Sequence, residues 1–184
     1  MTVAAKVVLI GPAGAGKSAI LERLASNVFR EDSLPTIGAA YASISLSKNP
    51  QHLIGVWDTA GQERNSALAP MYYRNSNAAL IVFDSTCRKS YSRALQWVTT
   101  IRESYPSIII ALTSAKIDLA NTREIPSIEL KDTASRLSVP YLEVSAKTSE
   151  GMASLISFLR DTADKVELRH SFPLPSPEPT TLSL

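Results

Sequence analysis

The chain has few of the residues that carry covalent or metal-dependent chemistry. Its 184 residues include one cysteine, Cys87, and two histidines, His52 and His170. One cysteine cannot close an intramolecular disulfide or hold a multi-cysteine zinc or iron–sulfur site, and we expect Cys87 to be a small packed side chain. The histidines have no nucleophile at a matching position, so a hydrolytic triad is excluded.

The chain also lacks a large net charge and long apolar runs. The 19 basic and 17 acidic residues give a net charge of +2, which argues against a nucleic-acid-binding protein that relies on bulk charge. The first apolar run ends at Gly11, too soon for a membrane span, and no signal-peptide cleavage site follows it. Residue 2 is Thr2 and the last residues contain no cysteine, so we expect neither N-myristoylation nor prenylation of this chain.

What the chain does have is the composition of a globular domain, with 45% hydrophobic and 20% charged residues. Short apolar runs alternate with amphipathic stretches, a pattern typical of an α/β domain with a mainly parallel sheet. The run at 40–46 alternates with polar residues and predicts an edge strand in a hairpin with 53–57. The predicted strands are residues 6–10, 40–46, 53–58, 79–84, 108–114 and 141–144.

Apolar residues at helical spacing predict helices around residues 20–28, 91–101 and 152–159. The composition changes near the end of the chain, where prolines stand at positions 173, 175, 177 and 179 with almost no charge between them. We therefore expect a folded domain of residues 1–168 and a flexible, Pro/Ser-rich tail of residues 169–184.

A glycine-rich motif follows the first predicted strand, where residues 11–18 are GPAGAGKS. The pattern G-x-x-x-x-G-K-S between a strand and a helix is typical of a phosphate-binding loop, because small residues let backbone N–H groups surround the β-phosphate. Lys17 would supply a positive charge to the β- and γ-phosphates, and Ser18 a hard oxygen ligand for Mg²⁺. The predicted nucleotide-binding residues of this segment are Ala13, Gly14, Ala15, Gly16, Lys17, Ser18 and Ala19.

A second motif, Asp58-Thr59-Ala60-Gly61, follows another predicted strand. A carboxylate at the end of a strand, such as that of Asp58, is suited to hold magnesium, and the backbone N–H of Gly61 is suited to approach a γ-phosphate. In series with the phosphate-binding loop, this motif indicates a nucleoside triphosphate as the ligand.

With these motifs, the segments 36–41 (TIGAAY), 57–64 (WDTAGQER) and 68–74 (LAPMYYR) resemble the Ras superfamily of small GTPases. Within it the chain is most similar to the Rab branch, which directs vesicle traffic, and to its early-endosomal subgroup. The resemblance covers about residues 6–165. It implies a P-loop NTPase (small G-protein) fold, with a doubly wound, six-stranded, mainly parallel sheet and helices on both faces. It also implies a switch that binds GTP or GDP with Mg²⁺ and hydrolyses GTP slowly.

The resemblance implies roles for residues between these motifs. Thr36, next to Pro35 in the nucleotide site, would bind Mg²⁺ through its hydroxyl and the γ-phosphate through its amide. Phe29 would pack against the guanine, and Gln62 would be the catalytic residue that orients the attacking water. With no arginine placed to act in cis, we expect unassisted hydrolysis at about 10⁻⁴–10⁻³ s⁻¹. The expected metal ligands are Ser18, Thr36 and Asp58.

Partners follow from the same resemblance. The expected effector-binding residues are Ile37, Tyr41, Trp57 and Tyr72, although ordinary packing on a sheet face is the alternative for the aromatic ones. The family implies effectors, an exchange factor and an activating protein. We expect a monomer in the cytoplasm and at endosomal or vesicle membranes, with membrane association indirect or through a lipidated C-terminus that this chain lacks.

Guanine recognition in this family uses the motifs N-K-x-D and S-A-K. The second is intact as Ser145, Ala146 and Lys147, and the amide of Ala146 would donate to guanine O6. Asp118 would accept hydrogen bonds from guanine N1–H and the exocyclic amine, so adenine would leave its carboxylate unpaired. Lys116 would lay its stem over the base.

The first motif departs from the family pattern, because Ala115 stands at the Asn position. That Asn normally bonds guanine N7 and ties the base loop to the phosphate loop. Its loss is expected to weaken nucleotide binding by about 1–3 kcal/mol, or about ten- to a hundredfold. Substitution for it by the neighbouring Ser114 stays open. A second departure is Asn65, where Rab proteins usually have an aromatic residue, which allows an altered set of partners.

Two other functions stay open on these residues. A catalytically inert Rab-like interaction module would keep the fold and bind nucleotide weakly because of Ala115. An ATPase or phosphotransferase on the same loop is disfavoured by Asp118 and by the intact S-A-K motif. The intact Lys17, Ser18 and Gln62 favour the switch over both.

Overall fold

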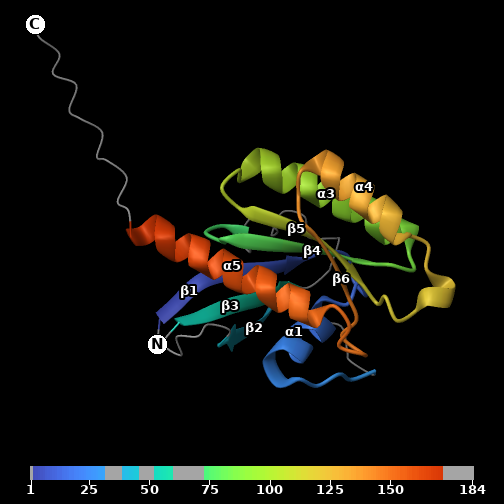
Figure 1. Ribbon diagram of the computed structural model, residues 1–184, viewed down its shortest axis with the longest axis horizontal. Coiled ribbons are helices and arrows are strands. Elements are labelled where there is room, and N and C mark those ends of the chain that lie inside the picture. Colours follow the sequence, from blue (N-terminus) through green and yellow to red (C-terminus); the bar gives the residue numbers. More distant parts are fainter. Residues whose placement is uncertain (1, 32–38, 46–51, 60–72, 172–184) are drawn as a thin grey trace, which may run out of the picture.

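The computed structural model describes residues 2–31, 39–45, 52–59 and 73–171. In chain order, and labelled as in Figure 1, the elements are β1 (Thr2–Ile10), α1 (Lys17–Ser26), β2 (Ala39–Ile44), β3 (His52–Thr59), β4 (Ala78–Asp84), α3 (Arg88–Ser104), β5 (Ile109–Ala115), the 3₁₀ turn η2 (Ala120–Thr122), α4 (Ser127–Leu137), β6 (Tyr141–Val144) and α5 (Met152–Ser171).

The strands form one six-stranded sheet in the order β2-β3-β1-β4-β5-β6. β2 runs antiparallel to β3, and every other pair of neighbours is parallel. The predicted mainly parallel sheet is therefore confirmed, and the predicted edge strand is present as β2, which ends at Ile44 rather than at residue 46. The turn predicted between β2 and β3 lies outside the described residues.

Helices cover both faces of the sheet. Figure 1 shows α3 and α4 together on one side and α1 and α5 on the other. The α1/α5 layer encloses buried residues such as Leu9 and Leu80, while the opposite layer encloses Ile81 and Phe83. Neighbouring residues of one strand enter different cores because strand side chains alternate between faces. This confirms the predicted doubly wound architecture.

Several boundaries differ from the predicted ones, and β2, β3 and β4 each begin one residue earlier than predicted. β1 begins at Thr2 rather than at residue 6, because its backbone pairs with β3 from the Thr2–His52 register onward, outside the apolar run. β5 lies one residue later than predicted and ends at Ala115. α5 extends to Ser171, past residue 168, where we placed the end of the domain. No helix among the described segments is long and apolar enough to cross a bilayer.

Gly151, directly before α5, is a position where the fold depends on glycine. Its φ is +72°, and a Cβ there would lie 1.8 Å from the carbonyl oxygen of Glu143 in β6. Since only backbone movement would relieve this overlap, Gly151→Ala is expected to lower the free energy of unfolding by about 2–4 kcal/mol. Urea denaturation of the nucleotide-free protein measures the loss.

Gly14→Ala is the matched control for this prediction. Gly14 has a similar φ of +74°, but no atom lies within 4 Å of its Cβ position. The control therefore carries the backbone strain without the steric overlap. Equal losses in the two variants would contradict the argument from overlap with β6.

Candidate functional site

The glycine-rich loop leads from β1 into α1. Gly14 and Gly16 adopt φ values of +74° and +100°, which favour glycine. A Cβ on Gly11 would lie 2.0 Å from the carbonyl oxygen of Val82 in β4, so the loop passes directly against that strand. Within the described structure no side-chain hydrogen bond caps the start of α1, and the start of a helix favours a bound anion. The predicted residues Ala13, Gly14, Ala15 and Gly16 form the loop, and Lys17, Ser18 and Ala19 begin the helix.

The ammonium group of Lys17 lies inside this loop. Its Nζ donates hydrogen bonds to the carbonyl oxygens of Gly11, at 2.8 Å, and Pro12, at 2.9 Å. Burial lowers the pKa of Lys17, while the carboxylate of Asp58 acts in the opposite direction. An anion bound in the loop would restore a favourable environment for this buried charge.

Ser18 and Asp58 meet at the end of the loop. Ser18 Oγ donates to Asp58 Oδ2 at 2.5 Å, and Asp58 is fully buried at the end of β3, which neighbours β1. A hydroxyl and a carboxylate oxygen are ligands that Mg²⁺ prefers. The described segments hold no cluster of three or more His, Cys, Asp or Glu side chains. This donor set fits Mg²⁺, which usually completes its shell with water and substrate phosphates.

A cavity of about 220 Å³ opens beside the loop. Gly16 belongs to its wall and to the start of α1, so the loop and the cavity are continuous. Residues predicted from the sequence to bind nucleotide form most of the lining: Gly16, Ala19, Phe29, Lys116, Asp118, Ala146 and Lys147. The others are Ile20, Glu31, Ala115 and Leu119.

The carboxylate of Asp118 is held from behind by Ser145. Ser145 Oγ donates to Asp118 Oδ1 at 2.6 Å and accepts a hydrogen bond from the backbone N–H of Thr148 at 3.0 Å. Ser145 is fully buried and does not line the cavity. Its hydroxyl therefore bears on the cavity through the orientation of Asp118.

The aliphatic part of the Lys116 side chain lies beside Gly16, at the end of the glycine-rich loop. Lys116 has a left-handed φ of +61°, and its Cε lies 4.0 Å from the Cβ position of Gly16. Its Nζ pairs with Asp84 Oδ2 at 2.7 Å. Burial acts to raise the pKa of Asp84, but hydrogen bonds from Lys116 and Thr86 outweigh it and hold that pKa below its ordinary value.

Ala115 occupies the place between the loop and the cavity. Its Cβ lies 3.3 Å from the Cβ position of Gly16. The alanine side chain has no polar atom that could bond the glycine-rich loop or a ligand in the cavity. Ser114 cannot replace the missing amide group, because alternate β5 side chains face opposite cores and Ala115 belongs to the α1/α5 layer. Ser114 is fully buried, and its hydroxyl has no hydrogen-bond partner in the described part of the chain.

Comparison with known proteins identifies the family and its fold. The family profile described as "Ras family" matches residues 6–165. The chain belongs to the Ras family.

The relatives lie in the Rab branch of this family. The chain is similar to Ras-related protein Rab-22A of Mus musculus, with 42% identity over 146 residues, covering 78% of this chain and 75% of the relative. Similarity to Ras-related protein Rab5A of Oryza sativa subsp. japonica is 42% over 147 residues, covering 79% and 72%. For Ras-related protein Rab-5A of Dictyostelium discoideum the values are 40% over 152 residues, 82% and 76%. The predicted resemblance to Rab proteins is confirmed, and the chain is a GTPase that works as a GTP-dependent switch.

An aromatic pair lies on the β2–β3 edge of this Rab GTPase. Tyr41 and Trp57 face each other across the two strands, with ring centroids 4.7 Å apart. Lys6 Nζ lies 5.5 Å from the centre of the Trp57 ring. Sheet packing accounts for Trp57, which lies against the core, but it leaves Tyr41 47% exposed.

Several predicted residues of the Rab GTPase lie outside the described residues. They are Pro35, Thr36 and Ile37 before β2, and Gly61, Gln62, Asn65 and Tyr72 after β3. Their roles stay predictions.

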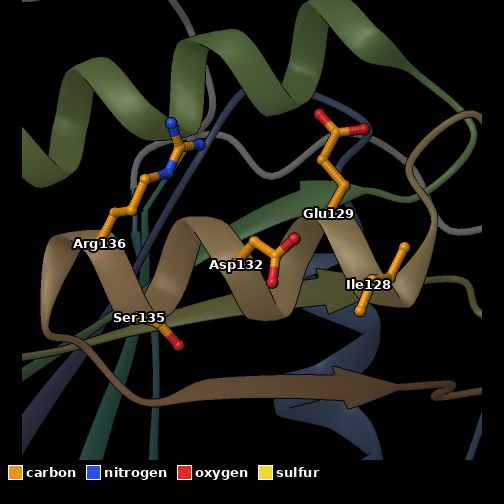
Figure 2. Close-up of a pocket in the computed structure, with 5 residues that line it drawn as sticks. All are labelled: Ile128, Glu129, Asp132, Ser135 and Arg136. Atoms are coloured by element: carbon orange, nitrogen blue, oxygen red, sulfur yellow. The ribbon is translucent and has the colours of Figure 1, made fainter.

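A separate hollow runs along α4 on the opposite side of the Rab domain. Figure 2 shows Glu129 and Arg136 pointing toward α3, while Ser135 points away from it. Glu129 pairs with Arg88 at the start of α3. This hollow shares no lining residue with the cavity beside the phosphate loop.

Sequence reasoning missed three residues that contact the site of this Rab GTPase. Arg23 bonds the backbone at Ala146, 123 positions away, Glu31 pairs with Lys147, 116 positions away, at 2.6 Å, and Asp84 pairs with Lys116. Spacing along the chain carries no signal for contacts at such separations, and only the topology brings these residues together.

Proposed function

We propose that this Rab GTPase binds guanine nucleotide across the loop at 11–18 and the adjoining cavity, and that it regulates endosomal membrane traffic through effectors that bind its GTP form. One observation carries the proposal. Gly16 lines the cavity and directly precedes Lys17 and Ser18, so groups suited to phosphate and groups suited to a base meet at the start of α1.

The loop end of the site would hold the phosphates. Backbone N–H groups at the start of α1 and the ammonium of Lys17 would neutralise their charge. Ser18, Asp58 and Thr36 would hold Mg²⁺, which when bound neutralises the charge that develops on the phosphates during transfer. In support, Ser18 and Asp58 already lie in contact.

The cavity end would hold the base. Asp118, oriented by Ser145, would accept from N1–H and the exocyclic amine of guanine, two donors that adenine lacks at the same places. The backbone N–H of Ala146 would donate to guanine O6. Phe29 and the stem of Lys116 would cover the faces of the ring.

Hydrolysis would depend on Gln62, which we propose orients the attacking water. The segment 32–38 contains no arginine, and Arg30, which follows α1, pairs with Glu22 of that helix at 3.2 Å. An activating protein would therefore have to supply the positive charge that speeds hydrolysis.

Replacing Gln62 with leucine tests this assignment. We expect Gln62→Leu to slow single-turnover GTP hydrolysis about tenfold or more, because water is no longer oriented, with little change in GDP affinity. Gln96→Leu on the exposed side of α3 is the matched control. Equal hydrolysis rates in the wild-type protein and Gln62→Leu would remove Gln62 from the mechanism.

The nucleotide bound to the purified protein tests the proposed function itself. Near-stoichiometric GDP, identified by chromatography and released slowly with Mg²⁺ present, is the expected result. The second candidate is an inert Rab-like module, favoured by the apolar contact that Ala115 makes in place of a polar one. It would be supported by an empty protein that neither binds nor hydrolyses added GTP.

We also propose the cellular setting that the family implies. The protein would act as a monomer with an exchange factor, an activating protein and effectors, and Tyr41, Trp57, Ile37 and Tyr72 would bind the effectors. It would lie in the cytoplasm and at endosomal or vesicle membranes, held there by a partner or by a lipidated C-terminus. The folded domain, which continues to the end of α5 at Ser171, would carry these functions.

A further inference from the structure

Arg23 in α1 bonds one wall of the base cavity and the residue, Asn27, from which the chain continues into another part of the lining. Its Nε donates to the carbonyl oxygen of Ala146 at 2.6 Å, and its Nη2 donates to that of Lys147 at 3.1 Å. Its Nη1 donates to the carbonyl oxygen of Asn27 at 2.7 Å and to Asn27 Oδ1 at 3.2 Å. One half-buried guanidinium thus makes four hydrogen bonds to two separate segments.

The first segment is the wall that carries the base-recognition groups. Ala146 and Lys147 line the cavity, and the preceding residue, Ser145, holds Asp118 at 2.6 Å. Because a peptide unit is planar, fixing the carbonyl of Ala146 also fixes the backbone N–H of Lys147. Arg23 therefore restrains the backbone to which the orientation of Asp118 is tied.

The second segment leads into the part of the lining that contains Phe29. Asn27 ends α1 with a left-handed φ of +55°, and the chain then turns to Phe29, which lines the cavity. The two parts of the lining also meet at the rim through Lys147 and Glu31, but both side chains are more than half exposed. An exposed ion pair contributes little, so the half-buried Arg23 is the stronger connection.

We propose that Arg23 is a positioning residue for guanine recognition, and that it joins the two parts of the cavity lining in a chain where Ala115 cannot tie the base loop to the phosphate loop. The inference rests on the proposed function. Arg23 itself does not line the cavity. It would act on the ligand through Ala146, Lys147 and, by way of Ser145, Asp118.

Two variants and one control test the proposal. Arg23→Ala removes all four bonds, while Arg23→Lys keeps the charge but loses the fork that reaches both segments. Arg102→Ala is the matched control, because Arg102 also donates to a backbone carbonyl, that of Leu137, far from the cavity. For each protein the GDP dissociation rate and the affinities for GDP and inosine diphosphate, which lacks the exocyclic amine, are measured with Mg²⁺ present.

We expect Arg23→Ala to speed GDP release by about ten- to a hundredfold. The preference for GDP over inosine diphosphate should fall as well, because Asp118 no longer meets the amine in a fixed position. Arg23→Lys should show a smaller change in the same direction, and it decides the question if Arg23→Ala does not fold. The control should keep the wild-type release rate and base preference.

An unchanged base preference in both Arg23 variants would overturn the proposal, even if release were faster, because general loosening of α1 does not distinguish the two bases. Wild-type protein that binds no guanine nucleotide would overturn the proposed function and this inference together. The two failures are distinguishable, since the first appears only in the variants and the second in the wild-type protein.

Discussion

Replacing Lys17 with alanine is expected to lower the affinity for GDP and GTP by about 10²–10⁴-fold, because two charge-assisted hydrogen bonds to phosphate are lost. Lys17 is 5% exposed, so its charge is nearly out of water. Burial lowers its pKa, and bound phosphate would favour the charged form again. Equilibrium titration with a fluorescent GDP analogue measures the loss.

Lys6→Ala is the control for this prediction. Lys6 is also a partly buried lysine whose pKa burial lowers, and its Nζ also donates to a backbone carbonyl, that of Arg74, at 3.0 Å. It lies outside the phosphate loop and should leave nucleotide affinity unchanged. An equal loss in both variants would show that general destabilisation, rather than phosphate binding, explains the result for Lys17.

Restoring asparagine at position 115 is expected to slow GDP release by about ten- to a hundredfold, because the new amide can bond both the base and the phosphate loop. The geometry favours this result, since Ala115 lines the cavity and its Cβ lies 3.3 Å from the Cβ position of Gly16. Release of a fluorescent GDP analogue, chased with excess unlabelled GDP, gives the rate.

Ala120→Asn provides the comparison, because Ala120 is exposed in the 3₁₀ turn that follows the same loop. It should release GDP at the wild-type rate. If Ala115→Asn also released GDP at that rate, other bonds would already hold the base loop. In that case contacts such as those of Arg23 would account for a larger share of the free energy of nucleotide binding.

The sequence predicted the parts of the fold that depend on local pattern. Unbroken apolar runs marked β4 and β5, alternation marked β2 as an edge strand, and the glycine spacing marked the loop before α1. Each of these features is a property of neighbouring residues. The candidate site was found for the same reason, because its motifs are short and occur in a fixed order.

The remaining features depend on contacts that no short segment contains. The start of β1 is set by backbone pairing with β3, and the role of Ser145 appears only where its hydroxyl meets Asp118. Ser114 is next to Ala115 in the sequence, which made it a candidate to replace the missing Asn. In β5, however, its side chain faces the opposite side of the sheet from Ala115, which belongs to the α1/α5 layer. Neither the pairing partners of a strand nor the hydrogen bonds that hold a cavity residue from outside the cavity have a local pattern in the sequence.

Helix α1 has ten residues, from Lys17 to Ser26, and is therefore about 15 Å long. Lys17 and Ser18 stand at its first turn, and Arg23 lies about 9 Å further along its axis. The helix thus fixes the separation between the glycine-rich loop and Arg23, which bonds the cavity wall at Ala146 and Lys147 that we propose contacts the base. We expect a ligand whose base and phosphates are spaced differently from those of a nucleotide to bind either the glycine-rich loop or the base cavity, but not both. We therefore expect selectivity for ligand length to depend on the helix as a whole rather than on one side chain.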